Sequence, residues 1–299
     1  MNFAGRFSDH ILPDKIHVLN VCFNVNGLKE KLGGTAGNIA YGLAQLGERP
    51  TVLACLGKDG ERYLNWLAKH DIECGCVRMV EDEFTAGAFI TTDHADNQIT
   101  GFNPGAMNYS CGFKLDGLNP ADSLAIVAPG NLEDMTSLPA RFRKLGVPFI
   151  FDPGQSLNIW QGSTLAEAMA GAQVLISNDY ELEMIMRMTG LDKKGLLALV
   201  QAIITTKGDQ GSVLCQLQGE CAVPAVPAKE VKDPTGAGDA FRAGLMKGLA
   251  QGQELFTACL WGASLASFAV ASYGTQEYIV QPAEFKAALD QARSLAGRL

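Results

Sequence analysis

The chain has 299 residues, of which 47% are hydrophobic and 19% are charged, and its formal net charge at pH 7 is −8. This length and apolar content allow a large buried core, in one α/β domain or in two smaller ones. The negative charge, with no Lys/Arg run longer than Lys193–Lys194, argues against a nucleic-acid partner. Eight scattered cysteines without a CxxC pair favour buried, reduced thiols in a cytoplasmic protein, and residues 1–10 lack the apolar stretch of a signal peptide.

Three runs in the first hundred residues alternate apolar and polar side chains and therefore predict strands. They are Lys15 to Val25, Phe84 to Thr92 and Gln98 to Phe102. The polar residues 93–97 join the last two runs, and we interpret His94 and Asp96 there as solvated turn residues. Together the runs predict a small sheet apart from the main body, with Asn103 at its foot as a candidate substrate contact.

Between these runs, residues 33–47 combine a glycine-rich turn with a helix. Gly33 and Gly34 permit a ligand to approach the backbone closely, and Gly47 stands where a helix C-terminus is expected. Asn38, near the start of the helix, can offer both a donor and an acceptor to vicinal hydroxyl groups. The alternative is that Asn38 only caps the helix.

The middle of the chain alternates short apolar strands with helices, which is typical of a parallel, doubly wound sheet with sites at the C-terminal ends of its strands. The predicted strands are 51–56, 124–128, 148–151, 174–177, 202–206 and 212–216, with an edge strand at 223–231, and the predicted helices are 61–70, 138–145, 164–170 and 180–189. Asp152 directly follows one of these strands. We expect it to face the cleft, toward an acceptor hydroxyl or a metal ion.

Residues 233–241 read DPTGAGDAF and lead into a helix. In Gly236, Ala237 and Gly238 the backbone can turn consecutive N–H groups toward one point, at the helix end where the macrodipole favours an anion. Asp239 places a carboxylate beside this phosphate cradle, where it can accept the proton of an attacking hydroxyl during phosphoryl transfer. The alternative is that Asp239 is an N-cap and the glycines only shape a turn.

The segment Leu255 to Ala271 carries no charge and approaches the length of a membrane span. It is rich in Ala, Ser and Gly, however, and it lacks the leucine density and the basic flank of an inserted helix. We therefore expect a buried helix and no membrane partner.

DPTGAGDAF, taken with GGTAGN at residues 33–38, resembles the two signature stretches of the ribokinase-like (PfkB) carbohydrate and nucleoside kinases. Both stretches stand in the order and at about the separation of that family, so the resemblance covers nearly the whole chain. It implies one ribokinase-like kinase domain over residues 1–299, an α/β fold with a doubly wound, mostly parallel sheet flanked by helices. A small β-sheet lid would comprise about residues 15–28 and 84–103, and the core about 33–80 and 104–299. Because the family's lid is often a dimer contact, we expect a homodimer through the lid.

The resemblance also implies two cation sites. Asn178 and Glu181 resemble the family's N-x-x-E element, which holds Mg²⁺ through water and orients phosphates. The competing interpretation makes Asp179 an ordinary N-cap. Asp233 and Thr235 match positions that help to hold a monovalent cation such as K⁺ in the ribokinase branch.

Substrate contacts follow from the same resemblance. The glycines of GGTAGN and Asn38 match residues that line the acceptor pocket, and residues 206–211 match the nucleotide-binding pattern T-x-G-x-x-G. The expected ATP contacts are Thr206, Lys207, Gly208 and Gly211. A hairpin turn is all that this second pattern establishes by itself.

The chain departs from the family at its start. Ribokinase-like enzymes begin with a core strand that ends in a Gly and then an Asp that grips the sugar, and this element should precede Gly5-Arg6-Phe7. Asp9 does not match the missing Asp in context. We therefore expect the natural chain to extend upstream of Met1; the alternative is a missing or replaced strand.

The favoured function is ATP- and Mg²⁺-dependent phosphorylation of a primary alcohol, with Asp239 as base and the amides of 236–238 as an anion hole. GGTAGN, DPGQ and NPGAM look most like the bacterial and archaeal nucleoside or adenosine kinase branch, and Phe23, Phe89 and Phe102 are expected to offer stacking faces for a nucleobase. The alternatives are a sugar kinase of the ribokinase or fructokinase type and a non-catalytic nucleotide or sugar sensor. The retained Asp239 speaks against a sensor.

Overall fold

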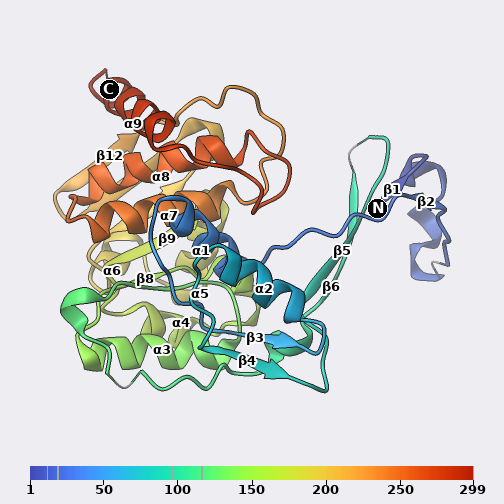
Figure 1. Cartoon of the computed structure of the whole chain (residues 1–299), viewed down its shortest axis with the longest axis horizontal. Helices are drawn as coiled ribbons and strands as arrows, with labels where there is room; N and C mark the ends of the chain where they lie inside the picture. The colour runs from blue at the N-terminus through green and yellow to red at the C-terminus, as the bar shows by residue number, and fades with distance from the viewer. Residues whose placement is uncertain (12, 19, 96, 116, 299) are drawn as a thin grey trace.

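The computed structural model describes residues 1–11, 13–18, 20–95, 97–115 and 117–298. Its central element is a six-stranded sheet with the strand order β12-β11-β10-β9-β8-β7 (Figure 1). Strands β7 to β10 pair in parallel, whereas β11 and β12 pair antiparallel. The strands are β7 (Ala125–Val127), β8 (Phe149–Phe151), β9 (Val174–Asn178), β10 (Ile203–Thr206), β11 (Ser212–Gln216) and β12 (Gly219–Val223).

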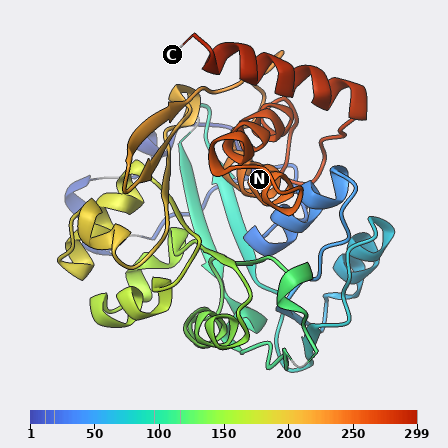
Figure 2. The same ribbon diagram turned by 90° about the vertical axis from the view of Figure 1, so that its left-hand side faces the viewer.

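Helices cover both faces of this sheet (Figure 2). One layer holds α3 (Leu132–Leu145), α4 (Gly162–Met169), α5 (Asp179–Thr189) and α6 (Lys193–Leu197), and the other holds α1 (Thr35–Gln45), α7 (Ala237–Ala250), α8 (Leu255–Ala269) and α9 (Pro282–Ala296). Strand side chains alternate between the layers: Phe149 and Phe151 belong to the core with α3 to α6, and Ile150 to the core with α1 and α7 to α9. This period of two explains why the strands are apolar throughout.

A smaller parallel pair lies outside the central sheet. It consists of β3 (Ala54–Gly57) and β4 (Val77–Val80), joined through α2 (Glu61–Lys69). The helix packs its buried Leu67 into the same core as α1 and α7. This arrangement places α2 beside the first turn of α1, which matters for the site.

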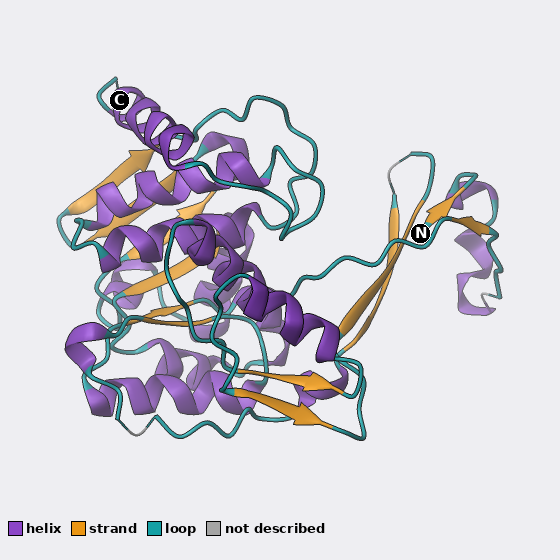
Figure 3. Ribbon diagram, viewed as in Figure 1, coloured by secondary structure: helices purple, strands orange, loops and turns teal. Residues whose placement is uncertain are grey.

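A third sheet, with the order β2-β1-β5-β6, projects from the body (Figures 1 and 3). Its strands are β1 (Asn2–Phe3), β2 (Val25–Asn26), β5 (Gly87–Thr92) and β6 (Gln98–Asn103). β5 and β6 form an antiparallel hairpin from Gly87↔Asn103 to Thr92↔Gln98. In the connecting loop His94 is exposed, as expected, and Asp96 lies outside the described residues.

The strand predicted over Lys15 to Val25 is wrong for most of its length. A 3₁₀ helix, η2 (Pro13–Val18), occupies part of it, and of its described residues only Val25 lies in a strand. Phe23 packs instead against Phe3 and Phe7, with ring centroids 4.8 and 5.1 Å apart. Because aromatic packing replaces strand pairing here, Phe23 is not a free face for a ligand.

Two other predicted boundaries are wrong. β12 ends at Val223, because the prolines at 224 and 227 cannot donate to a ladder, so residues 223–231 are not an edge strand. α3 begins at Leu132 rather than at 138, since Asn131 caps it by accepting a hydrogen bond from the Asp134 amide at 3.2 Å.

The uncharged segment forms the predicted buried helix, α8, which packs along α7. Within the described ranges, no helix has the length and apolar character needed to cross a bilayer. All eight cysteines are free. Cys111, Cys215 and Cys259 are buried, but Cys22 and Cys221 are exposed, and for these two the prediction of buried thiols is wrong.

Candidate active site

The first turn of α7 presents unbonded backbone donors. Gly236 is the N-cap with φ 81°, a left-handed conformation, and a Cβ there would lie 2.7 Å from Thr275 Cγ2, so glycine is required. The amide of Ala237 donates to Pro234 O at 3.2 Å, whereas those of Gly238 and Asp239 have no acceptor in the described part of the chain. These two N–H groups stand at the positive end of a fourteen-residue helix. They are available to an anion.

Asp239 lies within this first turn and bonds across to α1. Its Oδ2 accepts a hydrogen bond from Asn38 Nδ2 at 2.7 Å. Burial raises the pKa of Asp239 to about 6, while the Asn38 hydrogen bond and the Arg242 charge lower it and the Asp152 charge raises it. The group is ionised at neutral pH yet more basic than an exposed aspartate. Because Gly236 is the N-cap, the alternative role of Asp239 as a helix cap is wrong.

Asp152 and Arg242 form a buried ion pair beside Asp239. Asp152 follows β8, is 1% exposed, and accepts a hydrogen bond from Arg242 Nε at 2.5 Å through Oδ2. Its Oδ1 has no partner among the described residues. Asp152 is thus buried, and its contact with an acceptor hydroxyl or a metal ion stays a prediction. Sequence reasoning did not identify Arg242, although its place three residues after Asp239 puts both on one face of α7.

Asn38 uses both ends of its amide inside the protein. Its Nδ2 donates to Asp239, and its Oδ1 accepts from Gln276 Nε2 at 3.0 Å. Gly34, not Asn38, is the N-cap of α1, so the capping alternative for Asn38 is wrong. Gly33 lies directly before this cap, and its carbonyl accepts from Tyr63 OH at 2.5 Å. Gln276 belongs to no sequence motif and could not be identified beforehand.

Asn178 and Glu181 form a capping box at the start of α5. Glu181 N donates to Asn178 Oδ1 at 2.7 Å, and Asn178 N donates to Glu181 Oε2 at 2.8 Å. Asn178 is therefore the N-cap, and the interpretation of Asp179 as the cap is wrong. Burial raises the pKa of Glu181, against the lowering effect of the Asn178 backbone hydrogen bond. The S/T/N-x-x-E spacing alone predicts such a box.

The turn after β10 lies beside Asn178. Strand register pairs Thr206 with Asn178, so the ends of β9 and β10 meet at one edge of the sheet. Lys207 N donates to Gly211 O at 2.8 Å and closes the turn, in which Gly208 and Gly211 have φ of 59° and 84°. Because the turn joins antiparallel strands β10 and β11, the simpler hairpin interpretation is correct, and its contact with ATP stays a prediction.

The carboxylate of Asp233 joins two loops behind the cradle. Its Oδ1 accepts from the Thr235 amide at 2.9 Å and its Oδ2 from the Gly274 amide at 3.1 Å. Burial tends to raise the pKa of Asp233, but the hydrogen bonds from Thr235 and Gly274 outweigh it and hold the pKa below its ordinary value. Both oxygens thus already have structural partners, and a role in cation binding stays a prediction.

Asn103 stands apart from the residues gathered around Asp239. It ends β6, and its Oδ1 accepts from the Gly105 amide at 3.3 Å within its own loop. Among the predicted residues, hydrogen bonds that involve described side chains join Asn38 to Asp239, Asn178 to Glu181 and Asp233 to Thr235. None of them reaches Asn103 or the turn at 206–211.

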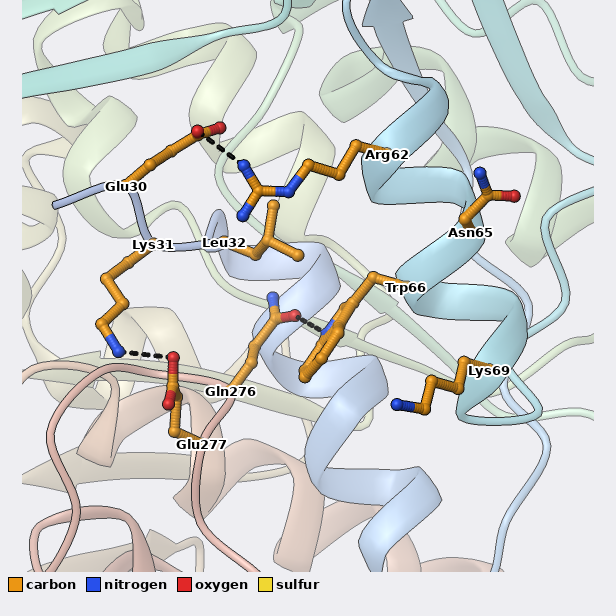
Figure 4. Close-up of a pocket in the computed structure, with 9 residues that line it drawn as sticks. All are labelled: Glu30, Lys31, Leu32, Arg62, Asn65, Trp66, Lys69, Gln276 and Glu277. Atoms are coloured by element: carbon orange, nitrogen blue, oxygen red, sulfur yellow. Dashed lines mark hydrogen bonds and ion pairs between the residues drawn. The ribbon is translucent and has the colours of Figure 1, made fainter.

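A cavity of about 280 Å³ is lined in part by Gln276, the residue that bonds to Asn38 Oδ1 (Figure 4). Trp66 of α2 and Gln276 line it together with Leu32, and the ion pairs Lys31–Glu277 and Arg62–Glu30 border it. Asp239 is not among its lining residues. The cavity therefore neighbours the candidate site without containing it.

Comparison with known proteins identifies the family. Residues 9–282 match the pfkB family carbohydrate kinases. This chain belongs to the pfkB family. Two archaeal nucleoside kinases are each 32% identical to this pfkB kinase: that of Methanocaldococcus jannaschii (86% of this chain, 85% of the relative) and that of Methanothermobacter thermautotrophicus (92% and 90%). The family predicted from the two motifs is confirmed.

Solved structures agree. The nucleoside kinase of Burkholderia thailandensis in complex with inosine superposes with a TM-score of 0.84 and 36% identity, over 98% of this pfkB kinase and 94% of that chain. The M. jannaschii nucleoside kinase, a member of the ribokinase family, gives a TM-score of 0.86 and 29% identity, over 97% and 94%. The predicted ribokinase-like α/β fold is thus confirmed.

Proposed function

We propose that this pfkB kinase transfers the γ-phosphoryl group of ATP to a primary hydroxyl of a nucleoside, with Asp239 as general base. The observation that carries the proposal is the setting of Asp239. Its carboxylate, with a pKa raised to about 6, stands beside the unbonded amides of Gly238 and Asp239 itself at the start of α7. The carboxylate removes the hydroxyl proton, and the amide N–H groups bind the negative charge of the transferring phosphoryl group.

The order of events follows from this geometry. The acceptor hydroxyl donates its hydrogen to Asp239, whose Oδ2 is already held by Asn38. Its oxygen attacks the γ-phosphorus as the bond to the departing ADP oxygen breaks, and the amides at the helix start bind the negative charge of the phosphoryl oxygens. Arg242 is held by Asp152 beneath the turn, so it supplies positive charge without leaving its place.

The polar atoms near Glu181 are suited to a hydrated Mg²⁺ ion. The capping box engages Oε2 of Glu181, which leaves Oε1, and Asp152 Oδ1 is a buried oxygen without a partner in the described chain. Oxygen ligands and retained waters are what this ion prefers, and when bound it would neutralise charge on the ATP phosphates. We propose that Asn178 and Glu181 hold it through water, and that the turn at 206–211 contacts the nucleotide.

The acceptor class rests on the relatives. Proteins named nucleoside kinase align with most of this chain, and one of their structures contains inosine. A sugar acceptor is the second candidate, because the family as a whole is described as carbohydrate kinases. A sensor without catalysis is the third, and the preserved base and donors speak against it.

We further propose that the projecting sheet is a lid over the acceptor, and that it mediates a homodimer. Phe89 and Phe102 on its strands are 61% and 57% exposed, which supports contact with a ligand or with a second copy. A cytoplasmic location and a K⁺ site at Asp233 and Thr235 are part of the same proposal. They can be tested by fractionation and by the K⁺ dependence of the rate.

A panel assay tests the function. ADP release from Mg²⁺ and ATP is measured with adenosine, inosine, other nucleosides, ribose and fructose as acceptors. We expect the highest kcat/KM with a nucleoside. Preference for ribose or fructose would contradict the acceptor class, and ATP binding without turnover on any acceptor would favour the sensor.

A further inference from the structure

A chain of side-chain hydrogen bonds runs from the indole of Trp66 to Asp239. Trp66 Nε1 donates to Gln276 Oε1 at 2.9 Å, as Figure 4 shows, and Gln276 Nε2 donates to Asn38 Oδ1 at 3.0 Å. Asn38 Nδ2 then donates to Asp239 Oδ2 at 2.7 Å. The four residues come from α2, the loop before α9, α1 and α7, so the chain links four separate segments at the site.

The direction of every bond in this chain follows from its first member. An indole N–H can only donate, so Gln276 must turn its oxygen toward Trp66 and its NH₂ group toward Asn38. Asn38 must then turn its oxygen toward Gln276 and its NH₂ group toward Asp239. An amide alone could take either orientation. The indole N–H of Trp66 can only donate and the ionised carboxylate of Asp239 can only accept, so both ends of the chain fix Asn38 with its NH₂ group on Asp239.

A side branch completes the bonding of Gln276. Its Nε2 also donates to Tyr63 OH at 2.6 Å, and Tyr63 OH donates to the carbonyl of Gly33 at 2.5 Å. Both N–H bonds of the amide are used, and Gln276 is 1% exposed. A Cβ on Gly37 would collide with the Tyr63 hydroxyl, so the sequence of α1 leaves room for this branch.

We propose that Gln276, held by Trp66 and Tyr63, is a positioning residue that fixes the Asn38 amide with its NH₂ group on Asp239. The proposal rests on the assignment of Asp239 as the base. With Oδ2 bonded to Asn38, Oδ1 is the oxygen left for the acceptor hydroxyl. If Asn38 were reversed, its oxygen would face the carboxylate and favour the protonated acid, which cannot act as a base. The second N–H of the Asn38 amide has no acceptor among the described residues, so it can donate to an oxygen of the acceptor.

Four ionisable groups surround Asp239. Arg242 and Asp152 act on it through their charges. Tyr63 and Tyr278 stay neutral near pH 7, since burial raises the pKa of Tyr63 to about 12 and raises that of Tyr278 further. The acid limb of the rate thus follows Asp239, whose pKa is raised to about 6. A shift in the acid limb of the rate therefore reports the Asn38 contact.

The test compares two tryptophans. Trp66→Phe removes the donor that orients the chain, whereas Trp261→Phe removes an indole N–H that has no partner among the described residues. For Trp66→Phe we expect kcat to fall roughly tenfold and the acid limb of kcat/KM to move up by about half a pH unit, the effect of one hydrogen bond. Trp261→Phe should leave both at the wild-type values. Equal effects in the two variants would overturn the proposal.

A near-isosteric variant reverses the hydrogen bond that Gln276 offers to Asn38. Gln276→Glu places an oxygen opposite Asn38 and so demands the reversed amide; its kcat should fall below that of Trp66→Phe, and its acid limb should move further up. An unchanged limb in Gln276→Glu would contradict the proposal. Thermal unfolding of each variant identifies any loss caused by misfolding.

A readout without catalysis separates this proposal from the proposed function. In ¹H–¹⁵N spectra of the full chain, the Trp66 indole signal is assigned by its loss in Trp66→Phe. Because the bonds are linked, Asp239→Asn should shift this signal and leave that of Trp261 in place. An unmoved Trp66 signal refutes the chain even if the enzyme phosphorylates nucleosides. A shifted signal without any turnover refutes the proposed function alone.

Discussion

The candidate active site and the projecting sheet differ in how deeply their side chains are buried. Around Asp239, polar side chains are buried and bonded: Asn38 is 5% exposed and Gln276 is 1% exposed. In the projecting sheet, every residue of β6 is exposed. The difference indicates that groups which must hold exact positions are built into the packed body, whereas the segment proposed as a lid keeps few contacts.

One carboxylate is buried at the projecting sheet. Asp93, 5% exposed, accepts hydrogen bonds from the amides of Phe7, Ala95 and Asn97. These bonds outweigh burial and lower the pKa of Asp93 to about 2. Asp93 thereby ties the tip of the hairpin to the N-terminal segment.

The largest expected effect concerns the base. Asp239→Asn should lower kcat by about 10² to 10⁴-fold, the usual contribution of a general base, while ATP binding measured by calorimetry stays near the wild-type value. The raised pKa means that the folded state loses stability as pH rises from about 4 through about 6, so the variant should also melt higher than wild type at pH 7. Asp290→Asn, an exposed charge removal, is the control.

The second largest effect is expected from breaking the buried ion pair of Arg242 and Asp152. Arg242→Ala leaves Asp152 charged and unpaired in the interior and should cost about 3–5 kcal/mol of unfolding free energy, measured by denaturant titration. Replacing both residues, as Arg242→Met with Asp152→Leu, should recover most of that loss without recovering activity. A double variant as unstable as the single one would show that the pair does not act as a unit.

The turn at the start of α7 should be more sensitive than a turn of similar conformation elsewhere. Gly190, at the end of α5, has φ 70° and open space around it, so Gly190→Ala should cost about 1 kcal/mol from backbone strain alone. Gly236→Ala adds the collision with Thr275 and should cost about 2–3 kcal/mol, with a loss of kcat. Equal costs would mean that Thr275 gives way easily.

The smallest effect on the body is expected from removing the hydrogen bonds that Asp93 accepts in the projecting sheet. Asp93→Ala should speed hydrogen exchange at the amides of Phe7 and Asn97, because both lose their acceptor. Amides of β9 in the central sheet should exchange as in wild type. Faster exchange in both regions would show that the projecting sheet is coupled to the body, which would contradict the difference between them.

The sequence predicted the body of the fold well because its signals are local. Apolar strands such as Val174–Asn178 and the helix at Leu255–Ala269 follow from composition and period. The alternation in Lys15 to Val25 was misleading because it predicts which side chains face inward, and here Phe23 packs against other aromatic rings rather than in a strand.

The candidate site also contains one part that is local in sequence and one part that only folding brings together. The turn at Gly236 to Asp239 could be found because glycine, helix start and carboxylate are adjacent in sequence. Gln276 and Trp66 could not be found in this way, because only folding brings them to the site. Gln276 bonds to Asn38 from 238 residues away, and Trp66 of α2 bonds to Gln276. Arg242 could have been identified, because it stands three residues after Asp239 and so lies on the same face of α7.

The central claim is that the Asp239 carboxylate takes the proton of the acceptor, and the pH dependence of kcat/KM tests it most directly. With the preferred acceptor, the rate should rise with pH to half its plateau at about pH 6, as the carboxylate forms, and then stay level through neutral pH. In Asp239→Asn the residual rate should lack this limb. A limb of unchanged midpoint in the variant would show that another group is the base and would contradict the account.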